Sequence, residues 1–364
     1  MIILYVTDAF AVWGGMERVL ADKMNYLVEL YGYDVCLMTI NQGQHSIPFP
    51  LNPMIKHLDL NVRMYAQYEY RGIMRLLKLI QLKNLLYERL RDALHETKPD
   101  IIVCAKLDFV GALDKVRGSM PLVVESHTLC NADNFENSGW IRRLHVRRFK
   151  SNVRKADFVV ALTEGDAKDW RKYNHNIVVI PNVVHLDDLK LLRNCSEKRI
   201  IFVGRFDKQK DFESLLQIWK FVYSCHSDWT LDIYSDGHIE APGVRMLKPV
   251  ANIMEQYRES SLLVLTSLFE PFGLVMPEAM SCGLPVVAFD CPYGPADIIT
   301  DGVDGFLVKN RDTNEFADRV CQLIEDKELR IKMGQAAIKS AQRYRADLIM
   351  PKWKELFESL CQKE

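Results

Sequence analysis

The stretch from Ser260 to Asp290 constrains the fold of this chain more than any other. It begins with an apolar run of strand length, SSLLVLTSL, passes through a Pro-Phe-Gly loop into a short helical pattern closed by Gly283, and ends in a second apolar run, PVVAFD. Strand, loop, helix and strand in this order build a parallel sheet covered by helices. Because ligands bind such sheets at the carboxyl ends of the strands, we expect the loop from Ser267 to Gly273 to line a ligand site.

The same alternation of apolar runs and amphipathic helical patterns recurs along the whole chain. A length of 364 residues suggests two domains rather than one core. A polar segment with a broken pattern, from about Asp187 to Lys198, is the expected linker. Further strands are expected at Ile2–Val6, Asp34–Ile40, Pro99–Ala105, Leu122–Glu125, Phe158–Leu162, Arg199–Val203 and Leu231–Tyr234.

Composition excludes several classes of protein. Apolar residues make up 48% and charged residues 26%, as in soluble globular proteins, and no stretch approaches the apolar length of a membrane span. The first residues lack the layout of a cleavable signal, so we expect a cytoplasmic protein. A net charge of −1 argues against nucleic-acid binding. Nine cysteines without a CxxC pair indicate reduced thiols, and without any Asp-x-Asp pair the sequence requires no catalytic metal.

Two carboxylates, Glu270 and Glu278, bracket the Pro-Phe-Gly loop. An ionised carboxylate only accepts hydrogen bonds, so it suits paired hydroxyls and would repel a diphosphate. The backbone N–H groups of Gly273 and Leu274, ahead of a helix, offer donors to an anion or a hydroxyl. The alternative interpretation is that both acids merely cap a surface helix.

A cationic loop follows the strand expected at Arg199–Val203. It carries Arg205, Lys208 and Lys210. Cations at the carboxyl end of a strand suit a nucleotide diphosphate, whose departure leaves negative charge on its phosphate. Taken alone, the loop is better explained as an ordinary basic turn.

Two further candidates follow strands of the first half of the chain. Gly14 and Gly15 lie between the first strand and a helical pattern, which is the phosphate-binding geometry of Rossmann-like units, although a tight turn would need the same residues. His127 follows the run LVVES at its carboxyl end. A neutral imidazole there can hydrogen-bond a substrate hydroxyl, whereas a lone histidine is more often structural.

Taken together, EPFGLVMPE, VGRFDKQK and the GGxE segment resemble the motifs of the retaining glycosyltransferases of family 4. The resemblance covers nearly the whole chain and implies the GT-B fold, an α/β architecture of two Rossmann-like parallel-sheet domains facing each other across a cleft. It implies an acceptor domain at 1–186, a nucleotide-sugar domain at 187–344, and a final helix at 345–364 that crosses back to the first domain. Two positions depart from the family pattern, which commonly has glycine at Val183 and at Asp211.

The resemblance also implies roles for the candidate residues. His127, Arg205, Lys210 and Glu270 would be catalytic, and Gly14, Gly15 and His127 would face the acceptor. Arg205 and Lys210 would clamp the diphosphate, and Glu278 would hold the ribose. The full set expected to bind the donor is Gly15, Arg205, Lys210, Glu270, Phe272, Gly273, Leu274 and Glu278.

The activity implied is transfer of a hexosyl or N-acetylhexosaminyl unit from a nucleoside diphosphate sugar to a hydroxyl of a glycan or lipid-linked glycan, with retention and without a cofactor. The loop after Asp290 looks most like that of members using UDP-sugars. Two alternatives remain open: a GT-B sugar-nucleotide 2-epimerase and a non-catalytic protein that binds sugar nucleotides.

Two basic amphipathic segments raise the question of a membrane. Met64–Arg91 reads as a helix with apolar and basic residues interleaved, and Trp140–Lys150 contains five basic residues among apolar ones. Either segment alone reads as a solvated helix face. Because two of them occur in one domain, peripheral contact with an anionic surface at the inner face of the cytoplasmic membrane stands as an equal alternative.

Overall fold

The structure is a computed structural model of the chain. It describes residues 1–131, 146–147, 150–186, 197–250, 252–309 and 311–362. Most of the expected linker and most of the segment Trp140–Lys150 lie outside these residues. The chain divides into two compact units: unit 1 comprises Met1–Leu162, Ala167–Val183 and Ile349–Glu364, and unit 2 comprises Thr163–Asp166 and Val184–Leu348.

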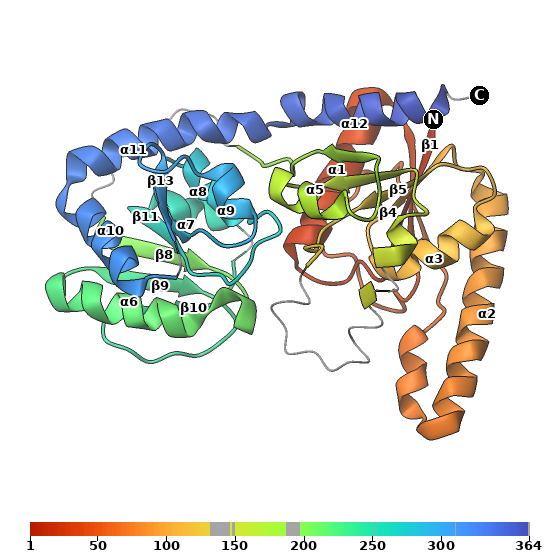
Figure 1. The fold of residues 1–364 in the computed structure, drawn as a ribbon, viewed down its shortest axis with the longest axis horizontal. Helices are drawn as coiled ribbons and strands as arrows, with labels where there is room; N and C mark the ends of the chain where they lie inside the picture. Colours follow the sequence, from red (N-terminus) through yellow and green to blue (C-terminus); the bar gives the residue numbers. More distant parts are fainter. Residues whose placement is uncertain (132–145, 148–149, 187–196, 251, 310, 363–364) are drawn as a thin grey trace. The chain divides into compact units, whose positions relative to one another are not determined.

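Unit 1 is built on a seven-stranded parallel sheet with the order β3-β2-β1-β4-β5-β6-β7 (Figure 1). β1 is an interior strand whose residues are apolar on both faces, and Ile3 pairs with Val35 of β2 and with Ile101 of β4. The strands are β1 (Ile2–Thr7), β2 (Asp34–Thr39), β3 (Lys56–Asp59), β4 (Ile101–Cys104), β5 (Leu122–Glu125), β6 (Phe158–Ala161) and β7 (Ile177–Val179).

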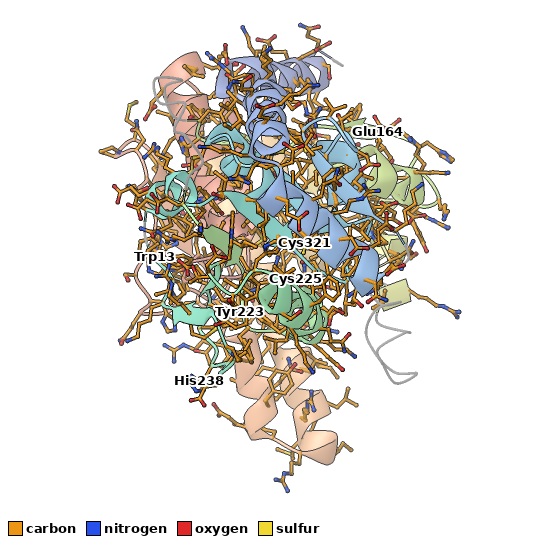
Figure 2. The ribbon with its side chains drawn as sticks, turned by 90° about the vertical axis from the view of Figure 1, so that its left-hand side faces the viewer. Trp13, Glu164, Tyr223, Cys225, His238 and Cys321 are labelled. Carbon is orange, nitrogen blue, oxygen red and sulfur yellow. The ribbon has the colours of Figure 1, made fainter. Side chains whose placement is uncertain are left out.

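Two helices cover the face of this sheet on which Tyr5 lies. α1 (Gly15–Tyr31) begins after Trp13, which is exposed (Figure 2), and ends at Gly32, whose φ of 63° places it in the left-handed region. α12 (Ala346–Cys361) joins unit 1 from Ile349 on. The two helices are in contact through Lys23 of α1 and Trp353 of α12.

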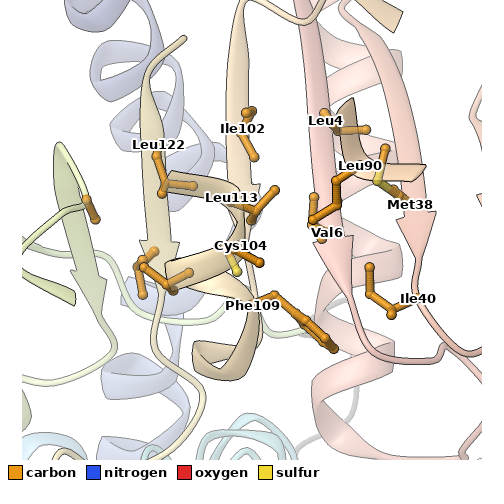
Figure 3. Close-up of a cluster of buried hydrophobic side chains, with 14 of the residues drawn as sticks. Leu4, Val6, Met38, Ile40, Leu90, Ile102, Cys104, Phe109, Leu113 and Leu122 are labelled. Atoms are coloured by element: carbon orange, nitrogen blue, oxygen red, sulfur yellow. The ribbon is translucent and has the colours of Figure 1, made fainter. Parts of the chain in front are cut away.

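The other face packs against α2 (Gly72–Thr97) and α3 (Leu107–Val116). Leu4, Val6 and Ile102 of the strands meet Leu90 and Leu113 of these helices (Figure 3). Burial of these side chains contributes on the order of 2 kcal/mol each to stability. A further helix of this part is α5 (Glu164–Trp170), whose first residues belong to unit 2.

The helix expected at Met64–Arg91 is divided in the structure. A 3-10 helix, η1 (Met64–Glu69), precedes the break at Tyr70 and Arg71, and α2 then begins at Gly72, whose φ is +53°. The left-handed backbone at this glycine reverses the chain, so η1 and the start of α2 run beside each other (Figure 1). None of the helices that the structure describes is long and apolar enough to cross a membrane.

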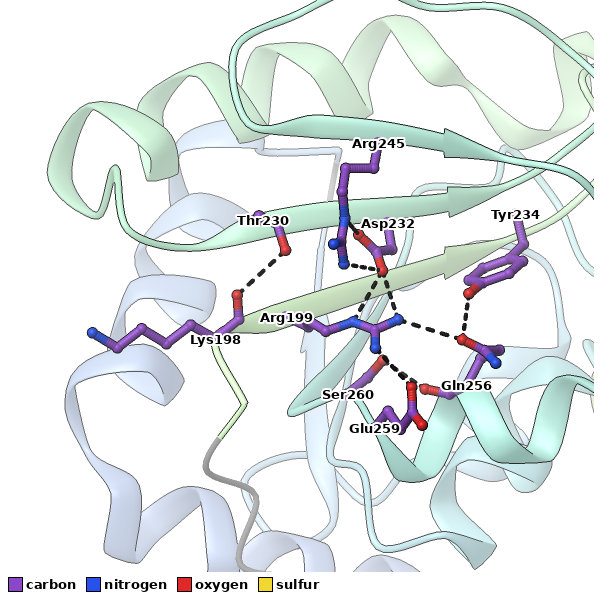
Figure 4. A network of polar contacts seen from close by, with 9 residues as sticks. All are labelled: Lys198, Arg199, Thr230, Asp232, Tyr234, Arg245, Gln256, Glu259 and Ser260. Atoms are coloured by element: carbon purple, nitrogen blue, oxygen red, sulfur yellow. Dashed lines mark hydrogen bonds and ion pairs between the residues drawn. The ribbon is translucent and has the colours of Figure 1, made fainter.

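Unit 2 contains a six-stranded parallel sheet with the order β10-β9-β8-β11-β12-β13. Buried Asp232 in β9 accepts hydrogen bonds from Arg199 of β8 and Arg245 of β10, so one carboxylate links three neighbouring strands (Figure 4). The strands are β8 (Arg199–Val203), β9 (Thr230–Tyr234), β10 (Val244–Leu247), β11 (Leu262–Leu265), β12 (Val286–Phe289) and β13 (Gly305–Val308).

Helices cover both faces of this sheet. α6 and α10 pack on the face that carries Phe202 and Phe289, while α11 packs on the turn that ends α8. A side chain at Gly334 of α11 would overlap with the carbonyl oxygen of Gly283, so this approach requires glycine. The helices are η3 (Lys208–Lys210), α6 (Phe212–Cys225), α7 (Ile253–Arg258), α8 (Val275–Ser281), α9 (Gly294–Ile298), α10 (Thr313–Glu325), α11 (Lys327–Ala341) and η4 (Gln342–Tyr344).

Candidate active site

The strand order of unit 2 reverses between β8 and β11, which are neighbours in the sheet although two other strands separate them in sequence. At such a switch point the loops leaving the two strands run in opposite directions and open a crevice at the carboxyl ends. The loop after β8 carries Arg205 and Lys210, and the loop after β11 carries Glu270. The fold therefore brings two of the predicted motifs to one place.

The loop after β8 directs Lys210 inward. Asp207 caps the 3-10 turn η3 by accepting a hydrogen bond from the Lys210 backbone N–H at 3.3 Å. The aliphatic part of the Lys210 side chain packs on Gly204, where a side chain would crowd it. Asp211 then adopts a φ of 49°, which explains why glycine suits this position, and its carboxylate caps α6 and pairs with Arg311.

Glu270 forms an ion pair with the ammonium group of Lys210. Lys210 Nζ donates a hydrogen bond to Glu270 Oε1, and the Ser267 hydroxyl donates to the same oxygen at 2.7 Å. The side chains of Lys210 and Glu270 are only 10% and 5% exposed. A buried carboxylate is stable in this place because a cation and a hydroxyl satisfy it.

The backbone around Glu270 is fixed by the loop after β12. The Glu270 N–H donates to the carbonyl of Pro292 at 2.7 Å, and the Glu270 carbonyl accepts from the N–H groups of Tyr293 and Gly294, both at 2.9 Å. A side chain at Gly294 would overlap with the carbonyl oxygen of Phe272. These contacts hold the carboxylate on a rigid loop rather than on a flexible one.

The Pro-Phe-Gly turn has two different faces. Phe272 is buried and packs edge-on against Tyr344, with ring centroids 5.3 Å apart, so in this structure its ring belongs to the core of unit 2. Gly273 has a φ of +84°, and within the described part of the chain neither its N–H nor that of Leu274 is hydrogen-bonded. These two donors precede α8 and remain available to a ligand.

Glu278 and Arg205 differ in burial. Glu278 lies in the first turns of α8, is 5% exposed, and its Oε2 accepts a hydrogen bond from the Tyr257 hydroxyl at 3.4 Å. The Arg205 side chain is 76% exposed and pairs with Asp207 at 3.2 Å. The structure thus brings Lys210 and Glu270 into contact, whereas Arg205 lies at the exposed side of the same loop.

The remaining candidates belong to unit 1. Gly14 is the N-cap of α1 and Gly15 its first residue, and the Glu17 side chain folds back over Gly14. His127 follows β5, so it lies at the same edge of the sheet as the loop that leaves β1. Its imidazole is 5% exposed, and Nε2 lies 3.2 Å from Glu125 Oε1.

Glu125, which lies next to His127, forms a buried ion pair with Lys23. Glu125, the last residue of β5, accepts a hydrogen bond from Lys23 of α1, and both residues are almost fully buried. Burial alone would raise the pKa of the Glu125 carboxyl, but the electrostatic and hydrogen-bond interactions with Lys23 and His127 outweigh burial and lower this pKa to about 2. The Lys23 ammonium also lies 4.1 Å from the ring centroid of Trp353 in α12.

Sequence reasoning did not assign a role to Ser267, Lys23 or Glu125. The sequence gives only a weak indication of the role of Ser267. Its hydroxyl lies three residues before Glu270 at the end of a strand, from where it can donate a hydrogen bond to the Glu270 carboxylate. Lys23 carries a stronger one: it lies between Leu20 and Leu27 on the apolar face of α1, where a lysine needs a buried partner. Among the described residues, no group of three or more His, Cys, Asp or Glu side chains is placed to hold a metal ion.

Family models match both halves of the chain. The model described as Glycosyltransferase Family 4 matches residues 13–188, and the model described as Glycosyl transferases group 1 matches residues 197–326. The amylovoran biosynthesis glycosyltransferase AmsD of Erwinia amylovora is 28% identical to this chain over 97% of the chain and 99% of AmsD.

Solved structures show the same fold. TarM of Staphylococcus aureus, in a complex with UDP, superimposes with a TM-score of 0.80 at 16% identity, covering 98% of this chain and 99% of that one. HepE of Anabaena, in a complex with UDP-glucose, superimposes with a TM-score of 0.75 at 18% identity, covering 99% and 100% of the two chains. With its two parallel-sheet units and both family matches, the chain belongs to the family 4-like glycosyltransferases of the GT-B fold.

Proposed function

We propose that this chain is a retaining glycosyltransferase that moves a hexosyl or N-acetylhexosaminyl unit from a UDP-linked sugar to a hydroxyl of a glycan or lipid-linked glycan. The acceptor belongs to the assembly of a surface polysaccharide or another glycoconjugate. The observation that carries the proposal is the contact of Lys210 with Glu270 at the switch point of unit 2. A buried cation beside a buried carboxylate provides one group for phosphate and one for sugar hydroxyls within a single site.

The two residues of the pair bind different parts of the donor. Lys210 Nζ has three N–H donors, of which one bonds Glu270, so the others are free to bind the diphosphate. Glu270 and the N–H groups of Gly273 and Leu274 bind hydroxyls of the donor sugar, Phe272 supports this turn, and Glu278 binds the ribose. Arg205, at the exposed side of the loop, moves from Asp207 onto the phosphate when the donor binds. Gly15, the first residue of α1, completes the proposed set of donor-binding residues.

The reaction breaks the bond between the anomeric carbon and the phosphate oxygen, and UDP leaves with the electron pair. The acceptor oxygen attacks the anomeric carbon on the face that UDP leaves, so the configuration is retained, and its proton passes to the departing phosphate. Lys210 and Arg205 stabilise the negative charge that develops on this phosphate. His127 positions the transferring sugar and the acceptor, and Gly14 and Gly15 line the acceptor side. Neither a metal nor another cofactor takes part.

The comparisons support the choice of donor and acceptor class. TarM is solved with UDP and α-GlcNAc-glycerol, HepE with UDP-glucose, and AmsD is named for the biosynthesis of a polysaccharide. For this chain we therefore place UDP-hexoses and UDP-N-acetylhexosamines first among the donors. We propose the cytoplasm as its location, because nucleotide sugar and the growing glycan meet there.

A donor screen tests the proposal. Purified protein is incubated with UDP-, GDP- and ADP-linked sugars without an acceptor, and slow release of nucleotide is measured together with the melting temperature. We expect stabilisation and release with one UDP-sugar, loss of release in Glu270→Gln, and no change in the matched control Glu259→Gln, whose carboxylate lies at the opposite end of the strands. After an acceptor is found, the coupling of the anomeric proton in the product reports retention or inversion.

Two outcomes would contradict the proposal in different ways. A donor epimerised at C2 without an acceptor would identify a 2-epimerase. Tight binding of UDP without release or transfer with any acceptor would identify a non-catalytic binding protein.

A further inference from the structure

The first half of α2 exposes an apolar face. Ile73, Leu76, Leu77 and Ile80 recur at the spacing of one side of a helix, and each is between 49% and 73% exposed. Further along, α2 packs on the core of unit 1 through a different stripe that starts at Leu82. The first half of the helix therefore extends beyond the core (Figure 1), and its apolar side chains lie in solvent.

The basic residues of this part lie on the opposite side of the helix. Arg75 and Lys78 continue the stripe that Leu82 begins, and they face the 3-10 helix η1 instead of the core. The Arg75 guanidinium lies 4.6 Å from the ring centroid of Tyr68, and Lys78 Nζ lies 5.9 Å from that of Tyr70. The usual arrangement of a surface helix is thus inverted here, with basic groups toward the protein and apolar groups toward solvent.

The whole hairpin of η1 and the start of α2, residues 63–80, shares this character. It contains four basic side chains and one acidic one, Glu69, which gives a net charge of +3. Exposed apolar and aromatic groups of this size are seldom left in water without a partner. The large apolar or aromatic side chains exposed in this hairpin are Tyr65, Tyr68, Tyr70, Ile73, Met74, Leu76, Leu77 and Ile80.

We propose that this hairpin binds the surface of an anionic lipid bilayer. Ile73, Leu76, Leu77 and Ile80 enter the boundary between headgroups and acyl chains, while the net positive charge of the hairpin attracts it to the anionic headgroups. The exposed tyrosines suit the headgroup level, where an aromatic ring is buried and its hydroxyl stays wet. Binding to the bilayer is separate from the transfer reaction and is measured without it.

Charge selects the bilayer over a second copy of the chain. A two-fold contact between hairpins would place two surfaces of charge +3 against each other, which opposes association. An anionic membrane has the complementary charge, worth about 1 kcal/mol for each basic residue near its surface.

Co-sedimentation with vesicles tests the proposal. The full chain is mixed with vesicles of phosphatidylcholine alone or with phosphatidylglycerol added, at low and high salt, and the bound fraction is measured. We expect binding that requires the anionic lipid and weakens at high salt. Ile73→Ser/Leu77→Ser should weaken it about tenfold or more, because two apolar side chains no longer enter the bilayer.

Matched variants distinguish membrane binding by this hairpin from binding that depends only on the total charge and apolar surface of the protein. Arg71→Gln/Arg75→Gln/Lys78→Gln should lose the salt-dependent part of binding, whereas Lys220→Gln/Lys332→Gln/Lys352→Gln removes the same charge elsewhere and should change little. Phe221→Ser/Val303→Ser removes two exposed apolar side chains of unit 2 and serves as the control for the apolar pair. UDP-sugar binding should be the same in all of these variants.

Three results would overturn the proposal. The first is wild-type protein that stays in the supernatant with anionic vesicles. The second is equal loss of binding in the hairpin variants and in their controls. The third is a concentration-dependent dimer that Ile73→Ser/Leu77→Ser abolishes, because this would assign the apolar face to a second copy of the chain.

Discussion

Replacing Lys23 by methionine should expose how strongly unit 1 depends on its buried ion pair. Methionine keeps most of the side chain that lies over Trp353 but removes the charge that neutralises Glu125. The carboxyl pKa of Glu125 falls from an ordinary 4.5 to about 2 in the folded chain. A shift of this size, to which Lys23 and His127 both contribute, corresponds to about 3 kcal/mol of stability, and breaking a buried pair typically costs about 3–5 kcal/mol.

The sign follows from the direction of the shift. Because the folded pKa is lowered, the carboxylate of Glu125 stabilises the fold above the unfolded pKa, and this contribution is lost as the pH falls from 4.5 toward 2. Burial lowers the pKa of Lys23, which offsets part of the gain at neutral pH. We therefore expect Lys23→Met to lose about 3 kcal/mol at pH 7 and to become less sensitive to acid than the wild type.

Urea unfolding at several pH values measures this loss, and hydrogen exchange in β1 and β5 assigns it to unit 1. The double variant Lys23→Met/Glu125→Gln should recover part of the stability, because no charge is then left unpaired. Lys354→Met on α12 is the matched control, since Lys354 makes an exposed pair with Glu358 at 3.7 Å and should contribute less than about 1 kcal/mol. A Lys23→Met variant as stable as this control would refute the reasoning.

Three further predictions concern packing and thiol chemistry. Gly294→Ala should displace Phe272 and abolish donor-dependent thermal stabilisation, since its methyl group would overlap with a backbone carbonyl; unchanged stabilisation by UDP-sugars would contradict this. Phe357→Ala in α12 should lower the free energy of unfolding of unit 1 by about 3–5 kcal/mol, measured by urea titration, because Phe357 is fully buried. Burial raises the pKa of the Cys104 thiol to about 12, so at pH 8 iodoacetamide should label exposed Cys225 and leave Cys104 unmodified, as mass spectrometry can check.

Local patterns predicted much of the fold because apolar runs and helix signals lie within short windows. The strand expected at Ile2–Val6 is observed as Ile2–Thr7, and that at Arg199–Val203 as β8. The order of strands within each sheet is not a local property, so the switch point between β8 and β11 became visible only in the fold. The resemblance to family 4 identified Lys210 and Glu270 as candidate residues, but their contact with each other is seen only in the structure.

Long-range partners account for what the sequence did not reveal. Lys23 is recognisable as a polar residue on an apolar helix face, but its partner Glu125 lies 102 positions away, and no periodicity connects them. The prediction of one continuous helix at Met64–Arg91 was wrong for a different reason. Gly72 adopts a positive φ that breaks the helical pattern, and a glycine in a sequence does not reveal which sign of φ it will take.

Titration of UDP into the wild-type protein, Lys210→Met and Lys208→Met by calorimetry tests the central claim most directly. The two lysines lie in the same 3-10 turn, but Lys210 is buried against Glu270 and Lys208 is exposed. With both variants shown to be folded by circular dichroism, the account predicts that Lys208→Met binds UDP like the wild type and that Lys210→Met loses at least about tenfold in affinity. Equal affinity in the wild type and Lys210→Met would contradict the assignment of the donor site to the switch point of unit 2.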